Sequence, residues 1–99
     1  MELVCMAMAG TLESSDAQVI IEPGNGTISL SIDSIVINQY GRQIKAVVLD
    51  TLKNLGVTSA KITIVDKGAL DCTIRARVEC AVYRAADCKE NIPWEGSTL

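Results

Sequence analysis

The sequence predicts an α+β fold in which a small sheet packs against two amphipathic helices. Residues 17–22 and 27–33 alternate apolar and polar side chains, which is typical of half-buried strands, and residues 60–66 add a third such segment. Residues 37–55 and 69–85 instead repeat apolar side chains with the helical period. Because each helix has one apolar stripe and each strand one apolar face, both helices are expected to cover the sheet.

The expected order of elements is ββαβα, with a possible extra strand within the apolar residues 3–9. Pro23-Gly24-Asn25-Gly26 is dense in turn-forming residues, so we expect the strands on either side of it to form an antiparallel hairpin. Ser34 or Asp33 is placed to cap the first helix and Gly56 to end it. Its apolar stripe comprises Ile37, Tyr40, Ile44, Val48, Leu52 and Leu55.

The second helix is expected to follow Asp66, which occupies an N-cap position. Asp71, Arg75 and Glu79 are four residues apart, so they are expected to form a ladder of surface ion pairs. The apolar stripe of this helix comprises Leu70, Ile74, Val78, Ala81, Val82 and Ala85.

Composition limits what the chain can do. Its 99 residues make one domain, and the net charge of −3 argues against nucleic-acid binding. No apolar run approaches the ~20 residues that span a bilayer, and the N-terminus lacks the basic residue of a signal peptide. The four cysteines form no Cys-x-x-Cys pair and the chain has no histidine, so we expect reduced thiols, no metal site and a soluble, cytoplasmic protein.

The segment Ala9–Asp16 is predicted to be an exposed loop, and within it Ser14 is the candidate functional residue. Without a histidine to activate it, this serine is a poor catalytic nucleophile but a good acceptor for a group that another enzyme transfers. The alternative is a turn or cap serine that bonds nearby backbone N–H groups. Since the first 41 residues hold five acids and no Lys or Arg, the surroundings of Ser14 are expected to be electronegative.

Three stretches resemble the acyl carrier (gamma) subunits of bacterial citrate lyase, at the family's spacing between about residue 7 and residue 85: Ala9–Asp16, Asp66-Lys67-Gly68-Ala69-Leu70-Asp71-Cys72 and Ile74-Arg75-Ala76-Arg77. The resemblance implies that Ser14 carries 2'-(5''-phosphoribosyl)-3'-dephospho-CoA through a phosphodiester, and that Ser15 stands where the family tolerates glycine. We expect a single acyl-carrier domain over residues 1–86, and the composition of residues 87–99 predicts a polar C-terminal tail.

The activity that the resemblance implies belongs to a complex, and the chain itself is expected to hold no catalytic residue. The carrier would shuttle acetyl and citryl thioesters between an alpha subunit (acyl transferase) and a beta subunit (lyase), while a prosthetic-group transferase loads it. The overall reaction cleaves citrate to acetate and oxaloacetate. The alternatives are a carrier of a related system such as malonate decarboxylase, or a non-carrier interaction subunit.

Other residues leave alternatives open. Asp33-Ser34-Ile35 resembles the modified Asp-Ser-Leu of fatty-acid carrier proteins, but those are four-helix bundles, so Ser34 is expected to be a helix cap. The acids beside Ser14 either help to hold a divalent cation for the transferase or only solvate the loop. Arg77 and Arg84 either contact phosphates or a partner, or form a solvated helix face. Trp94 either docks on its own domain or on a partner.

Overall fold

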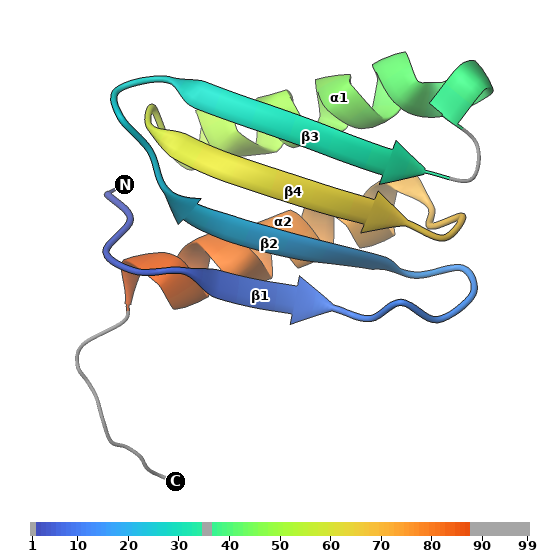
Figure 1. Ribbon diagram of the computed structural model, residues 1–99, viewed down its shortest axis with the longest axis horizontal. Helices are drawn as coiled ribbons and strands as arrows, with labels where there is room; N and C mark the ends of the chain where they lie inside the picture. The colour runs from blue at the N-terminus through green and yellow to red at the C-terminus, as the bar shows by residue number, and fades with distance from the viewer. Residues whose placement is uncertain (1, 35–36, 88–99) are drawn as a thin grey trace, which may run out of the picture.

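The computed structural model describes residues 2–34 and 37–87. In this part of the chain, a four-stranded mixed sheet is covered on one face by two helices, and its other face is open (Figure 1). The predicted α+β fold is therefore confirmed, and the possible N-terminal strand is present. The elements in order are β1 (Ala7–Gly10), β2 (Ala17–Pro23), β3 (Ile28–Ser34), α1 (Ile37–Asn54), β4 (Ala60–Asp66) and α2 (Asp71–Ala86).

The strand order is β1-β2-β4-β3, and it makes the predicted hairpin of β2 and β3 wrong. β4 lies between them, antiparallel to β2 and parallel to β3, and the hairpin partner of β2 is β1. The turn-rich residues 24–27 therefore cross the start of β4, a width of two strand spacings or roughly 10 Å. The bond from the Ala60 N–H to the Thr27 carbonyl (3.0 Å) fixes this crossing.

The hydrophobic core lies between the sheet and the helices. Alternate residues of β2 and β4 point toward the helices and are buried, and each helix buries one stripe against them, as the periodicity predicts. The largest fully buried apolar side chains are Val19, Ile21, Val48, Leu52, Ile62, Ile64, Ile74, Val78 and Val82. Leu70 differs from the prediction, because it precedes α2 and is 71% exposed.

The C-terminus of α1 is closed by backbone bonds around Gly56, as predicted. The Gly56 N–H donates to the Lys53 carbonyl (3.0 Å) and the Val57 N–H to the Leu52 carbonyl (2.9 Å), with Gly56 at φ +71°. This is the Schellman pattern, which requires a left-handed residue that glycine adopts without steric cost. At the other end, residues 35–36 and the side chains of 37–40 lie outside the described residues, and so do the predictions for Ile37 and Tyr40.

The predicted ion-pair ladder along α2 is wrong. Arg75 instead pairs with Asp50 of α1 (3.1 Å), and Asp71 accepts a hydrogen bond from Gln43 of α1 (2.6 Å). The side chains lean across to the neighbouring helix, which lies alongside α2 on the same face of the sheet (Figure 1). These contacts hold the two helices together instead of stabilising one helix alone.

The cysteines only partly follow the prediction of reduced thiols. Cys72 and Cys80 are free, whereas Cys5 is disulfide-bonded. Cys88 and Trp94 lie outside the described residues. Within residues 2–34 and 37–87, no helix has the length and apolar composition to cross a membrane, and no group of three or more acidic or cysteine side chains is arranged to hold a metal ion.

Candidate functional site

The segments that the sequence marks as functional lie together at one end of the sheet. β1, β3 and β4 all end there and β2 begins there, since Ala17 and Ser34 both lie opposite Asp66. The Ser14 loop, residues 11–16, connects β1 to β2 at the same end (Figure 1). Both helices also begin there, so the segment joining β4 to α2 lies beside the Ser14 loop. The topology thus brings together two motifs that are about fifty residues apart in the sequence.

The Ser14 loop is anchored through the backbone on the residues that follow Ser14. The Ser15 N–H donates to the Lys67 carbonyl (2.8 Å), and the Lys67 N–H donates back to the Asp16 carbonyl (2.9 Å). Ser14 itself is exposed, and its hydroxyl makes no hydrogen bond within the described part of the chain. This weighs against the alternative role of a turn or cap serine, because such a hydroxyl would bond a backbone N–H.

Ser15 adopts a left-handed conformation, with φ +66°, and it is the only non-glycine residue described with positive φ. Glycine adopts this conformation without steric cost, whereas other residues lose roughly 1–2 kcal/mol. The backbone at this position therefore suits glycine, as the resemblance to citrate lyase carriers implies. It also indicates that the Ser15 hydroxyl is dispensable.

Asp16 is the side chain that fixes the loop to α2. Its carboxylate accepts two bonds from Arg77, at Nε (2.9 Å) and Nη2 (3.2 Å), one from the Thr11 hydroxyl (2.6 Å) and one from the Ala17 N–H (2.7 Å). Asp16 is only 14% exposed. The bonds from Arg77, then those from Thr11 and Ala17, hold the pKa of this carboxyl well below its usual range. Asp16 is thus a structural clamp and not a solvated acid.

The expected electronegative surroundings of Ser14 are accordingly wrong in part. Arg77, from the basic second half of the chain, neutralises Asp16, and Arg84 donates to the Met8 carbonyl of β1 (2.6 Å). Both arginines therefore tie α2 to β1 and its loop, a role that the sequence analysis did not consider. Glu13 remains as an exposed acid of the loop.

Asp66 organises the neighbouring segment. It is 2% exposed, and its carboxylate accepts bonds from the Gly68 N–H (3.1 Å), the Ala69 N–H (2.8 Å) and the Ser34 hydroxyl (2.8 Å). The predicted N-cap role is wrong, because α2 begins only at Asp71 and Asp66 instead closes the turn that precedes it. Since Ser34 donates to this buried carboxylate, its hydroxyl is less available for modification than that of Ser14.

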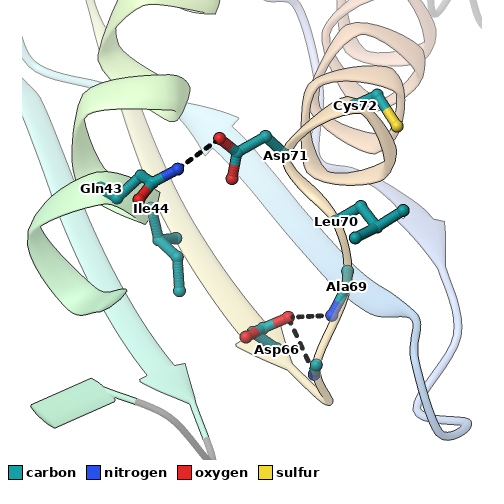
Figure 2. Close-up of a pocket in the computed structure, with 8 residues that line it drawn as sticks. Gln43, Ile44, Asp66, Ala69, Leu70, Asp71 and Cys72 are labelled. Carbon is teal, nitrogen blue, oxygen red and sulfur yellow. Dashed lines mark hydrogen bonds between the residues drawn. The ribbon is translucent and has the colours of Figure 1, made fainter. Parts of the chain in front are cut away.

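A cavity of about 580 Å³ lies between α1 and the segment that joins β4 to α2. Figure 2 shows Gln43 and Ile44 of α1 on one side, Ala69, Leu70 and Asp71 on the other, and Asp66 at the lower end. The sequence patterns do not predict this cavity. Its one visible signal is Leu70, an apolar residue at the N-cap of α2, where no side chain caps the helix.

The chain matches the family model described as "ACP: Malonate decarboxylase delta subunit (MdcD)" over residues 5–85. A solved malonate decarboxylase hetero-tetramer from Pseudomonas, in complex with malonate, contains a chain of the same fold. Its TM-score is 0.69 at 24% identity, over 86% of this chain and 92% of that one. At this identity the likeness concerns the fold alone.

Curated relatives are much more similar in sequence. Citrate lyase acyl carrier proteins from Pectobacterium atrosepticum and Vibrio cholerae are 54% and 57% identical over 95 residues, with 95% or more of each chain covered. The carrier of Streptococcus equi subsp. zooepidemicus is 55% identical over 87% of this chain and 85% of its own. The geometry agrees with such a role, since it displays an exposed serine on a loop that is anchored at the residues after it. The chain belongs to the family of citrate lyase acyl carrier proteins.

Proposed function

We propose that Ser14 is the residue through which this carrier holds its prosthetic group, phosphoribosyl-dephospho-CoA, in a phosphodiester bond. The observation that carries the proposal is the contrast within one loop. Ser15 and Asp16 are fastened to the rest of the domain, whereas the Ser14 side chain is exposed and its hydroxyl has no partner in the described structure. When bound, the group supplies a thiol that forms acyl thioesters.

The charges at this end of the sheet suit an anionic phosphodiester at Ser14. With Asp16 neutralised by Arg77, the loop keeps only one uncompensated acid, Glu13, close to Ser14. The N-terminal end of α2 lies at the same end of the sheet as the Ser14 loop, and the positive end of its dipole favours a phosphodiester there. The Asp16–Arg77 pair thereby both shapes the loop and removes a repulsive charge from it.

The domain's own contribution is to present the serine and to stay rigid. The chain has no histidine, and the carboxylate of Asp16 is fully engaged, so a base on the transferase must take the proton from the Ser14 hydroxyl. The clamp between Asp16 and Arg77 keeps the loop in one conformation while that enzyme binds. No residue of this chain needs to act on the acyl group.

The carrier is a subunit of a multi-subunit complex, and its partners are the alpha and beta subunits of citrate lyase. A thioester on a long tether reaches both active sites without dissociating, so its effective concentration at each is high. The acetyl group would be exchanged for citryl at the alpha subunit, and the citryl thioester cleaved at the beta subunit. This sequence of reactions requires the carrier to present its serine to the transferase, and then the thioester of the attached arm to the alpha and beta subunits.

The related alternative, a carrier for malonate decarboxylase, has support from the family model and from the fold of the hetero-tetramer. The identities of 54–57% to citrate lyase carriers favour citrate lyase. The acyl group separates the two. A loaded carrier should be acetylated and accept citryl from a citrate lyase alpha subunit, and should not accept malonyl from the transferase of malonate decarboxylase.

The first experiment is intact mass after reaction with the enzymes that synthesise and transfer the prosthetic group. We expect one phosphoribosyl-dephospho-CoA adduct, found on the peptide that contains Ser14. It should be lost in Ser14→Ala and retained in the matched controls Ser15→Ala and Ser34→Ala. An unmodified wild-type chain, with the same enzymes active on a known carrier, would overturn the proposal in favour of a non-carrier interaction subunit.

A further inference from the structure

The cavity beside α2 and the Ser14 loop share one piece of backbone. Asp66 and Gly68 line the cavity, and Lys67, between them, exchanges hydrogen bonds with Ser15 and Asp16. A group attached at Ser14 therefore starts near the cavity, and the far end of a long group, beyond its phosphates, can fold back to reach it. Its volume of about 580 Å³ falls within the range of roughly 300–1,000 Å³ that is typical of small-molecule sites.

The lining of the cavity selects a neutral ligand. Asp66 and Asp71 place two carboxylates in it, which disfavours phosphate groups and the carboxylates of a citryl group. Ile44, 3% exposed, and Ala69 supply apolar surface toward its interior, and Leu70 supplies more at its exposed margin. A flexible chain with apolar branches, and without charge, fits this combination.

The cavity offers hydrogen-bond partners for both polar groups of an amide: donors for its carbonyl and an acceptor for its N–H. At the start of α2 no side chain caps the helix, so first-turn N–H groups remain as donors for a carbonyl. The Asp71 carboxylate, held in place by its bond from Gln43 (2.6 Å), can accept an amide N–H. An arm built from secondary amides would satisfy both sets.

We propose that this cavity holds the pantetheine arm of the prosthetic group between visits to the partner active sites. This inference rests on the proposed attachment at Ser14. Leu70, which lines the cavity at the N-cap of α2 and is 71% exposed, leaves apolar surface that the arm can contact. The partner enzymes would then have to draw the arm out of the cavity before the thioester reacts.

Cys72, an exposed free thiol that lines the cavity, allows a trapping experiment. The loaded carrier is treated with a mild added oxidant, which accepts two electrons while two protons are released, as the arm thiol and the Cys72 thiol form a disulfide. Peptide mapping should join the Ser14 and Cys72 peptides. The control is the double variant Cys72→Ser/Gln18→Cys, which places a cysteine beside Gly10 on the opposite, open face of the sheet.

We expect the Cys72 crosslink to form about tenfold faster than the crosslink to Gln18→Cys, because the cavity raises the local concentration of the arm thiol. Equal or slower trapping at Cys72 would overturn the inference. Variant Leu70→Asp, at an exposed position that leaves the core unchanged, should reduce the trapping rate at Cys72 while leaving the control rate unchanged.

Amide chemical shifts give a readout that needs no added thiol. Conversion from the unloaded to the loaded carrier should shift the amides of Ile44, Ala69 and Leu70 in addition to residues 11–16. Shifts confined to residues 11–16 would contradict the inference. Intact mass distinguishes the two ways in which the experiments can fail. If no prosthetic-group adduct forms, both the proposed function and this inference are overturned. If the adduct forms but the amides of the cavity residues do not shift and trapping at Cys72 is not selective, this inference alone is overturned.

Discussion

Gly10 is the position where a single methyl group should do most damage to the Ser14 loop. It ends β1 at φ +87°, and an added Cβ would lie 1.9 Å from the Ala17 carbonyl oxygen and 3.1 Å from Cδ of Arg77. The first atom belongs to the backbone of the paired strand and cannot rotate away. Gly10→Ala must therefore separate β1 from β2 at the base of the loop.

Gly26 provides a matched control, since it also has positive φ (+92°) but an added Cβ would meet nothing within 4 Å. A left-handed φ destabilises the folded state by roughly 1–2 kcal/mol for a non-glycine residue. Replacing glycine also lowers the conformational entropy of the unfolded chain, which stabilises the fold by about 0.5–1 kcal/mol. Gly26→Ala should therefore cost about 1 kcal/mol. Gly10→Ala adds the loss of one or two backbone hydrogen bonds, at about 1 kcal/mol each, for a total of about 2–3 kcal/mol.

Thermal unfolding of the two variants measures this difference. At roughly 4–8 °C per kcal/mol for a domain of this size, Gly26→Ala should lower Tm by about 5 °C and Gly10→Ala by about 15 °C. The transferase should also load Gly10→Ala more slowly, with no such effect in Gly26→Ala. Equal melting temperatures for the two variants would refute the argument that Gly10 is required by contact with Ala17.

Three further predictions concern the site. The folded pKa of Asp16 lies below the unfolded value of about 3.9, so its carboxylate stabilises the fold fully above pH 4 and loses this contribution as the pH falls through the folded pKa. The Tm of wild type should therefore exceed that of Asp16→Asn at pH 7, and this difference should shrink below pH 4. A difference that stays constant with pH would contradict the pairing of Asp16 with Arg77. Asp66→Asn should lower the free energy of unfolding, measured with denaturant, by about 1–3 kcal/mol, because it disturbs three hydrogen bonds of a buried carboxylate. Ser34→Ala should lower it less, and equal losses would count against Asp66 as the residue that organises this turn. Ser15→Gly should melt at or slightly above the wild-type temperature and load normally, whereas a clear loss of Tm would show that the Ser15 side chain contributes to the loop.

The sequence was sufficient for the elements and their buried faces, because periodicity reports which side chains face the core. It was not sufficient for neighbours in the sheet. The turn-rich residues 24–27 have the composition of a hairpin turn, yet they cross the start of β4. A signal for this existed in β4, where β-branched Thr63 and Val65 alternate with Ile62 and Ile64, so both faces suit the centre of a sheet.

The Ser14 loop was recognisable from its residues as a candidate site, but its anchoring was not. Asp16 and Arg77 are 61 residues apart, and charge segregation along the chain suggested an acidic loop. Only the antiparallel pairing of β1 with β2, and the packing of α2 behind both, brings the guanidinium to the carboxylate. Likewise Asp66 has the composition of an N-cap, but four residues separate it from the first residue of α2.

The arrangement of the sheet explains how a carrier combines a fixed base with an accessible serine. Two backbone bonds to Lys67 and the bidentate pair to Arg77 immobilise the loop immediately after Ser14, and Gly10 fixes its beginning against β2. Ser14 is consequently held at a defined place although its own side chain contributes nothing to the fold. Because the Ser14 side chain makes no structural contact within the described residues, bonding a bulky group to it should cost the fold little stability, which suits the proposed attachment at this residue.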